Sequence, residues 1–301
     1  MTRPVDENGR EFNLDRGLVR RSFNAASQTY DEAAVLQREV RERLHSRLEY
    51  VRLAPEVAVD LGTGTGHGAR ALKSRYPGAH VIGIDLAPGM LHAARSQRSL
   101  FRRFGLVCAD AARLPLRDGS ADLIVSNLML QWCDEPDRVF AEATRTLRPG
   151  GLFTFTTFGP DTLKELRNAW SAADTHTHVN RFIDMHDLGD ALVRAGLAEP
   201  VLDVEHFTLT YPDVLNLMHD LKAIGAHNVT RGRAPGLTGR RRFAAMLSAY
   251  ESMRRDGRLP ATYEVVYGQA WAPPERRPAA SGEAVVPFSA IRRRRDRSHP
   301  E

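Results

Sequence analysis

Short apolar runs alternate with amphipathic segments between residues 56 and 158. The apolar runs are rich in β-branched residues, and their sequences are EVAVDLG, HVIGID, FGLVCAD, ADLIVSN and GLFTFTTFG. The longer segments between them have helical character and read HGARALKSRYPG, APGMLHAARSQRS and CDEPDRVFAEATRTLRPG. Strands that are apolar on both faces and joined by crossover helices form parallel sheets. The pattern therefore predicts an α/β fold with a doubly wound, mostly parallel sheet.

The last of these helical segments carries signals for both of its ends. Asp134 is predicted to cap its amino end, and Pro136 falls in its first turn. Gly150 is predicted to end the helix.

The chain on either side of this region is predicted to be largely helical. In residues 14–50, apolar side chains recur at every fourth position and so share one helix face, and Asp31 is predicted to cap that helix. The stripe consists of Leu36, Val40, Leu44 and Leu48. Residues 160–200 and 212–257 are also predicted to be mostly helical. The strand-like segments VLDVEHFTLTY and TYEVVYGQAWA follow them.

Composition removes several classes of protein. No apolar run approaches the ~18 residues that a membrane span needs, and the amino-terminal segment MTRPVDENGREF is charged and polar. The two cysteines, Cys108 and Cys133, cannot make a disulfide framework or a zinc quartet. His176 and His178 have no third metal ligand nearby in sequence, so no metal is expected. We expect a cytoplasmic protein that binds no membrane.

Glycines at alternate positions follow the first predicted strand: Gly62, Gly64, Gly66 and Gly68. Bare backbone lets N–H groups approach a ligand closely, at the amino end of a helix. In an open α/β sheet the ligand crevice lies at the carboxyl ends of the strands. The sequence therefore predicts a cofactor-binding loop here.

The glycines alone leave the cofactor open, because Gly64, Gly66 and Ala69 satisfy the dinucleotide fingerprint, with Asp85 about 20 residues on. Three acids at successive strand ends argue against a dinucleotide. Asp60 suits an ammonium group and would repel a pyrophosphate, Asp85 can accept both ribose hydroxyls, and Asp110 can accept an exocyclic amine. A ligand with an amine, a ribose and an adenine but no phosphate is S-adenosylmethionine.

The motifs VDLGTGTGHG, GIDLAPGML, CADAARLPLRDGSADLIVSNLMLQW and LRPGGLFTFTTFG resemble the class I S-adenosylmethionine-dependent methyltransferases. The resemblance covers about residues 56–158 and implies a Rossmann-like, seven-stranded sheet. Thr63 stands where that family usually carries Cys, which leaves the backbone loop intact. The cofactor-binding positions that the resemblance implies are Asp60, Gly62, Thr63, Gly64, Gly66, Asp85, Leu86, Met90, Asp110, Ala111 and Asn127.

The flanking segments narrow the resemblance. RRSFNAASQTYDEAAVLQREVRERL, FTTFGPDTLKELRNAW, LKAIGAHNVTRGRAPGLTGRRR and LPATYEVVYGQAWAP resemble the malonyl-acyl-carrier-protein O-methyltransferases of biotin synthesis, over about residues 15–273. This resemblance implies that the chain methylates the free carboxyl of malonyl-acyl carrier protein, so that fatty-acid enzymes can extend the ester towards a pimeloyl chain. The implied partner is an acidic carrier protein.

The implied organisation is one methyltransferase domain, residues 51–273, with a helical lid segment before it (residues 1–50). Helical lid insertions are expected at about 160–200 and 212–257. Residues 274–301 are predicted to be a disordered basic tail, because residues 275–301 hold seven Arg against four acids and too few periodic apolar positions to offset the entropy of ordering.

The acceptor chemistry needs few catalytic groups, because a carboxyl with a pKa near ~4 is already ionised at neutral pH. Tyr30, His227 and Asn228 are expected only to position the reactants. An arginine is expected to hold the carboxylate, and a basic cluster to contact the carrier. The candidates for these two roles are Arg145, Arg231, Arg233, Arg240, Arg241 and Arg242.

Other functions stay open at this point. A methyltransferase for a small free carboxylic acid would not need the basic insertion, and a non-catalytic adaptor of the same fold would bind the carrier without transferring a methyl group. A nicotinamide-dependent oxidoreductase would bind a dinucleotide. A nucleic-acid partner is disfavoured, because no aromatic residues interleave the arginines as stacking platforms.

Overall fold

The computed structural model describes residues 14–98, 103–230 and 238–274. Its single sheet has seven strands in the order β3-β2-β1-β4-β5-β7-β6. The strands are β1 (Val57–Leu61), β2 (His80–Asp85), β3 (Gly105–Cys108), β4 (Ala121–Asn127), β5 (Leu147–Phe158), β6 (Ala198–Tyr211) and β7 (Leu259–Trp271). The first five strands pair in parallel, and β7 runs antiparallel to both β5 and β6. The predicted doubly wound, mostly parallel α/β sheet is confirmed.

Ten α-helices and three short 3₁₀ segments are described. The helices are α1 (Arg16–Ala26), α2 (Tyr30–Ala33), α3 (Val35–Arg47), α4 (His67–Arg75), α5 (Pro88–Ala94), α6 (Pro136–Thr146), α7 (Lys164–Ser171), α8 (Met185–Arg194), α9 (Val214–Ala223) and α10 (Arg240–Glu251). The 3₁₀ segments are η1 (Leu48–Tyr50), η2 (Arg95–Gln97) and η3 (Leu130–Trp132). None of the described helices is long and apolar enough to cross a bilayer.

Two apolar cores lie on opposite faces of the sheet. Neighbouring residues of one strand alternate between them, as Ala58 and Val59 of β1 do, because successive side chains of a strand point to opposite faces. The core that contains Ala58 packs against α3 and α4, and the core that contains Val59 packs against α6 and α8. The edge strand β6 instead alternates between exposed and half-buried residues.

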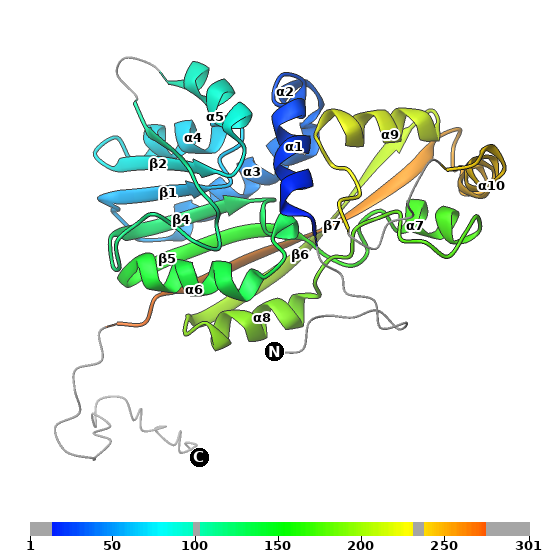
Figure 1. The fold of residues 1–301 in the computed structure, drawn as a ribbon. Coiled ribbons are helices and arrows are strands. Elements are labelled where there is room, and N and C mark those ends of the chain that lie inside the picture. Colours follow the sequence, from blue (N-terminus) through cyan, green and yellow to red (C-terminus); the bar gives the residue numbers. More distant parts are fainter. Residues whose placement is uncertain (1–13, 99–102, 231–237, 275–301) are drawn as a thin grey trace, which may run out of the picture.

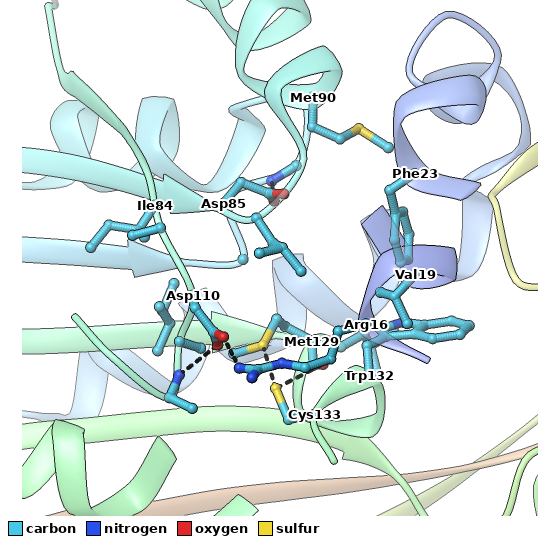
Figure 2. Close-up of a pocket in the computed structure, with 18 of the residues that line it drawn as sticks. Arg16, Val19, Phe23, Ile84, Asp85, Met90, Asp110, Met129, Trp132 and Cys133 are labelled. Carbon is cyan, nitrogen blue, oxygen red and sulfur yellow. Dashed lines mark hydrogen bonds and ion pairs between the residues drawn. The ribbon is translucent and has the colours of Figure 1, made fainter. Parts of the chain in front are cut away.

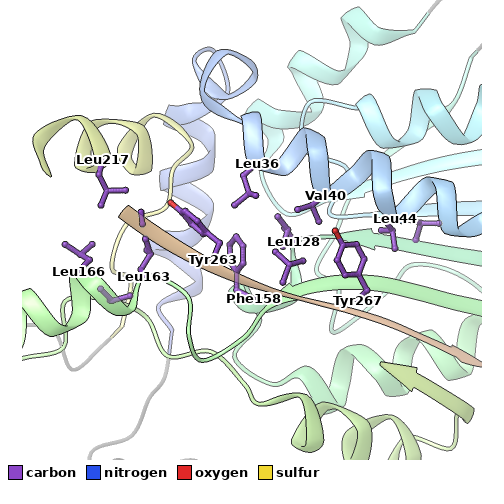
Figure 3. Packing of buried hydrophobic residues seen from close by; sticks show 14 of the residues in the cluster. Leu36, Val40, Leu44, Leu128, Phe158, Leu163, Leu166, Leu217, Tyr263 and Tyr267 are labelled. Carbon is purple, nitrogen blue, oxygen red and sulfur yellow. The ribbon is translucent and has the colours of Figure 1, made fainter. Parts of the chain in front are cut away.

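The apolar stripe predicted on α3 is confirmed. Leu36, Val40, Leu44 and Leu48 are all at most 5% exposed. Figure 3 shows the first three facing Tyr263 and Tyr267 of β7. Asp31 does not cap this helix, because it lies inside α2 and α3 begins after Ala34.

The predicted ends of α6 are corrected. Pro136 is its first residue, but Glu135 precedes it, and Asp134 accepts a hydrogen bond from the Leu14 N–H at 2.9 Å and does not cap the helix. The helix ends at Thr146, and β5 begins at once, so Gly150 lies within the strand. The helix therefore stops before the predicted glycine, because pairing of β5 with β4 already begins at Leu147.

The segments predicted to be helical insertions are less helical than expected. In residues 160–200 only α7 and α8 are helices, and residues 172–184 between them are not. There the carboxylate of Asp174 accepts hydrogen bonds from the His176 N–H and from the ring of His178. Such local side-chain bonds compete with helix formation. Residues 212–257 contain α9 and α10, and residues 231–237 lie outside the described part.

Figure 1 shows α1 and α2 at the centre of the molecule, beside α5 and α9. Residues 16–33 therefore form a segment over the carboxyl ends of the central strands. Below, the name lid segment is used for these residues, which are part of the longer segment 1–50 predicted from the sequence. Residues 275–301 of the predicted basic tail lie outside the described residues, and the division into domains stays a prediction.

Candidate active site

A cavity of about 120 Å³ lies between the lid segment and the carboxyl ends of β1, β2 and β4. Figure 2 shows Arg16, Val19 and Phe23 of α1 on one side of it, and Ile84 and Asp85 of β2 on the other. We call this the central cavity. It is the crevice that an open α/β sheet offers to a ligand.

A second, smaller hollow of about 60 Å³ adjoins it and is called the loop cavity. It is lined by Asp31, Arg38, Arg41, Asp60 and Thr63, among others. Both cavities share four residues, namely Tyr30, Gly62, Gly64 and Asn127. Because of this shared border, we treat the two cavities as one cleft.

Three glycines of the glycine-rich loop, Gly62, Gly64 and Gly66, adopt positive φ angles, and the first two line the cleft. Gly62 has φ +78°, and a Cβ there would lie 2.4 Å from Cγ of Met129. Gly64 has φ +52° with open space where a Cβ would be. Gly66 lines neither cavity. A Cβ there would meet the Cβ of Ala94 at 2.8 Å, so this glycine permits close packing of α4 on the end of α5.

Asp85 is held rigidly at the end of β2. Its Oδ1 accepts a hydrogen bond from the Ala87 N–H, and its Oδ2 accepts one from the Gly64 N–H, both at 2.8 Å. Burial raises the pKa of Asp85, while these backbone donors lower it. A carboxylate has about four lone-pair sites, so Asp85 retains capacity to accept hydroxyl hydrogen bonds from the central cavity.

Asp110 lies at the other end of the central cavity, two residues after β3. Its Oδ1 accepts the Ala112 N–H at 2.9 Å, and its carboxylate forms an ion pair with Arg16 of α1. Figure 2 shows Arg16 reaching across to this carboxylate from the lid segment. No signal in the sequence distinguishes Arg16 from the other arginines of α1, so it was not predicted.

Asp60 lies at the floor of the loop cavity and is only 3% exposed. The Thr63 hydroxyl donates to its Oδ2 at 2.6 Å. Burial raises the pKa of Asp60 to about 6, although the hydrogen bonds from Thr63 and from the Ala69 N–H lower it. A buried carboxylate with an elevated pKa gains from a bound cation, which suits the ammonium group predicted from the sequence.

The raised pKa of Asp60 predicts a pH dependence of ligand binding. Its usual pKa is about 4. With a pKa of about 6 in the folded protein, the ionised form opposes folding, and this cost is absent at low pH and fully present above pH 6. An ammonium group bound beside the carboxylate offsets the cost. We therefore expect the affinity for an aminated ligand to be constant from pH 6 to about pH 7, where both groups are charged, and to fall about tenfold per pH unit below pH 6.

Calorimetric titration of S-adenosylmethionine between pH 5 and pH 8 measures this profile. The variant Asp60→Asn cannot titrate and is expected to flatten it. An affinity of the unmodified chain that does not change over this range would contradict the role of Asp60.

The remaining predicted cofactor positions line the cleft. Leu86, Met90 and Ala111 border the central cavity. Asn127 borders both cavities, and its amide is engaged at each end: Nδ2 donates to the Gln37 carbonyl at 3.1 Å, and Oδ1 accepts the Thr156 hydroxyl at 2.9 Å. These bonds fix the wall of the cleft at the end of β4.

Side-chain hydrogen bonds connect the lid segment to the loops beside the cleft. The Thr65 hydroxyl donates to Oδ1 of Asp31 at 2.6 Å, and the His67 ring lies 3.1 Å from its Oδ2. Asn24 accepts the Gly89 N–H at 2.7 Å. Burial and the nearby carboxylates raise the pKa of Tyr30 well above its usual value, so its hydroxyl stays neutral. Tyr30 thus covers the cleft as a neutral group.

A third and larger cavity, of about 820 Å³, lies beside α7 and α8 and is called the α7–α8 cavity. It meets the central cavity at Cys133 and Asp134, which line both. Burial raises the pKa of the Cys133 thiol to about 12, which makes it a packed and unreactive group. No sequence pattern predicts this cavity, because its lining comes from segments far apart in the chain.

Several predicted substrate residues lie elsewhere. Arg145 donates to the carbonyls of Leu114 and Leu116 and pairs with Glu142 and Asp118, and it borders none of the three cavities. Its guanidinium is already fully used, so this structure gives Arg145 a structural role. Arg231 and Arg233 lie outside the described residues.

His227 and Asn228 also border none of the three cavities. His227 is exposed. Asn228 donates to the Thr177 carbonyl at 2.5 Å and accepts from the backbone and hydroxyl of Thr230, and so ties two loops together. Thr230 does line the α7–α8 cavity, so Asn228 acts on it only indirectly.

The basic cluster is on the surface. Arg240, Arg241 and Arg242 are all exposed in the first turn of α10. Arg242 lies 3.9 Å from the carboxylate of Asp174, which lines the α7–α8 cavity. The cluster therefore borders one rim of that cavity.

The strand order, the glycine loop after β1 and the acids at the carboxyl ends of β1, β2 and β3 together define a class I S-adenosylmethionine-dependent methyltransferase. The buried Asp60, the oriented Asp85 and the open Gly64 fit the amine, the ribose and the close approach of that cofactor. S-adenosylmethionine is the methyl donor of this class.

Comparisons with known proteins agree with this class and narrow it. The family described as "Methyltransferase domain" matches residues 59–155. A malonyl-[acyl-carrier protein] O-methyltransferase of Methylovorus sp. is 55% identical over 281 residues, which are 91% of this chain and 95% of that protein. One from Laribacter hongkongensis is 54% identical over 92% of this chain and 97% of that protein. The chain belongs to the malonyl-[acyl-carrier protein] O-methyltransferase family.

Solved structures agree on the fold alone. The YcgJ protein of Bacillus subtilis is 17% identical with a TM-score of 0.55, over 76% of this chain and 97% of that chain. A S-adenosylmethionine-dependent methyltransferase of Thermotoga maritima is 16% identical with a TM-score of 0.51, over 84% of this chain and 99% of that chain.

Proposed function

We propose that this chain transfers a methyl group from S-adenosylmethionine to the free carboxylate of malonyl-acyl carrier protein, forming the methyl ester that enters biotin synthesis. The observation that carries the proposal is the likeness to relatives of this name over nine-tenths of the chain. The cavities support it, because the cleft offers matched groups for the cofactor and the adjoining, larger α7–α8 cavity offers space for the acceptor.

We infer that three acids hold the cofactor in the cleft. Asp60 would bind its ammonium group, Asp85 would accept its ribose hydroxyls, and Asp110 would accept its adenine amine. Arg16 shares the Asp110 carboxylate, and this is compatible with the role because each carboxylate oxygen accepts about two hydrogen bonds. Tyr30 and the rest of the lid segment would exclude water from above.

For methyl transfer, this chain has to align the reacting atoms and exclude water from them. S-adenosylmethionine, when bound, supplies an electrophilic methyl group on a sulfonium. A malonyl carboxyl is ionised at neutral pH, so no side chain has to remove a proton, and the neutral Tyr30 hydroxyl agrees with this. Opposite charges disappear as the methyl moves, so the lid segment favours transfer by excluding water, and the walls of the cleft favour it by aligning the reacting atoms.

The carrier would dock on the exposed arginines of α10. Arg240, Arg241 and Arg242 offer a positive surface to an acidic protein. Because α10 packs on α7, and Arg242 lies next to the cavity-lining Asp174, a thioester arm on the docked carrier would enter the α7–α8 cavity.

Mass spectrometry of the carrier tests the proposal. Incubation of malonyl-acyl carrier protein with the chain and S-adenosylmethionine is expected to add the mass of one methylene group, in a form that base hydrolyses. Malonyl-coenzyme A and free malonate, at equal concentration, are the comparison substrates. Equal turnover of all three would remove the carrier assignment, and no mass gain on any of them would remove the acceptor assignment.

A further inference from the structure

Two arginines line the α7–α8 cavity, Arg167 of α7 and Arg181 of the loop before α8. Arg167 is half-buried, and one of its Nη atoms donates to the Thr162 carbonyl at 2.8 Å. Within the described part of the chain, no carboxylate lies within 4.0 Å of the Arg167 guanidinium. Burial lowers the pKa of Arg167, the more distant carboxylates of Asp161 and Glu165 raise it, and the neighbouring charge of Arg181 lowers it. Burial and the charge of Arg181 both favour the binding of an anion next to Arg167.

Three of the four acidic side chains that line the same cavity accept hydrogen bonds from neighbouring groups. Asp174 accepts from the His176 N–H and the His178 ring, and Asp134 accepts from the Leu14 N–H. Asp184 caps α8, and Asp187 lies in the first turn of that helix, where the helix dipole stabilises a negative charge. Within the described residues, none of these four carboxylates forms an ion pair with Arg167.

The cavity also reaches the place where methyl transfer would occur. Gln131, which follows β4, and Thr157, near the end of β5, both line it, and their side chains lie 3.4 Å apart. Cys133 and Asp134 connect it with the central cavity. An anion held in this cavity would thus lie at the carboxyl ends of the strands that border the cofactor.

We propose that Arg167, with Arg181 beside it, binds the free carboxylate of the acyl chain and makes the enzyme prefer a dicarboxylic to a monocarboxylic thioester. This inference rests on the proposed function. The planar guanidinium can grip a carboxylate through two parallel hydrogen bonds. The carboxylate loses its charge on methylation, so this grip is strongest before transfer and releases the ester product.

A cycle of binding measurements tests the contact directly. The affinities of malonyl-acyl carrier protein and of acetyl-acyl carrier protein, which lacks the carboxylate, are measured in the presence of S-adenosylhomocysteine so that no methyl is transferred. The proteins are the unmodified chain, Arg167→Gln, Arg167→Lys, Arg181→Gln and the control Arg52→Gln. Arg52 is exposed before β1, at the opposite end of the strands.

We expect the unmodified chain and Arg52→Gln to bind the malonyl carrier about tenfold more tightly than the acetyl carrier. Arg167→Gln is expected to abolish this preference, while Arg167→Lys retains part of it and Arg181→Gln reduces it. Unchanged binding of S-adenosylhomocysteine shows that each variant is folded.

Two results would overturn the inference. If Arg167→Gln keeps the tenfold preference, Arg167 does not contact the carboxylate. If it weakens both carriers equally, Arg167 binds a group that they share, such as the phosphate of the thioester arm. Failure of the proposed function is separate from both, because it appears as absence of methyl transfer to the malonyl carrier by the unmodified chain.

Discussion

Replacing Asp85 with alanine is expected to lower the affinity for S-adenosylmethionine by a factor of about a hundred to a thousand. In the proposed complex its carboxylate accepts both ribose hydroxyls. A hydrogen bond to a charged group contributes about 1.5–3 kcal/mol, and about 1.4 kcal/mol corresponds to a tenfold change in affinity. The variant also removes the acceptor for the N–H groups of Gly64 and Ala87, so the glycine-rich loop loses an anchor.

Calorimetric titration with S-adenosylhomocysteine measures this effect without turnover. Asp190→Ala is the matched control, because Asp190 is an exposed acid on α8 that borders none of the three cavities. Circular dichroism checks that the sheet remains folded. An affinity of Asp85→Ala within a few-fold of the unmodified chain would remove the ribose assignment.

Reversing the charge of Arg240, Arg241 and Arg242 to glutamate together is expected to lower kcat/KM for malonyl-acyl carrier protein about a hundredfold at low salt. Electrostatic attraction between a basic patch and an acidic protein raises association rates by about 10- to 1,000-fold. The three side chains are exposed on α10 and do not line the cleft, so the affinity for S-adenosylmethionine should not change.

The dependence on salt separates steering from a local defect. Salt screens such a patch over about 8–10 Å, so the loss should shrink as ionic strength rises. Malonyl-coenzyme A has no acidic protein body, and any turnover of it should change little. The single variants Arg241→Glu and Arg52→Glu compare one charge reversed inside and one outside the patch. A loss that is the same at all salt concentrations would count against docking on α10.

The central strands could be predicted because a buried strand has a recognisable local sequence. A strand covered on both faces needs a continuous apolar run at its centre, and residues 57–59 of β1 and 123–125 of β4 are such runs. Helix boundaries were predicted less well. Asp31 and Asp134 have the chemistry of capping residues, but their carboxylates are used by Thr65 and by Leu14. A cap signal in sequence cannot show that a distant donor competes for the same oxygen.

Asp60, Asp85 and Asp110 could be assigned to one site from the sequence because of the topology of the sheet. Strands that run parallel end at one edge of the sheet, so residues at the carboxyl ends of β1, β2 and β3 must meet there. The arginines were not accessible in this way. Arg145 has the right chemistry but is saturated by Glu142, Asp118 and two carbonyls, while Arg167 and Arg181 resembled any other surface arginine in the sequence.

The sequence by itself determined the sheet, the glycine-rich loop and the acids beside it, because each depends on local periodicity, on backbone freedom or on the rule that parallel strands end together. The tertiary structure alone decided which arginine side chains line a cavity and which are hydrogen-bonded or ion-paired to neighbouring carbonyls and carboxylates. That outcome depends on contacts between segments far apart in the chain, as between Arg16 and Asp110 or between Leu14 and Asp134, and no local pattern encodes such contacts.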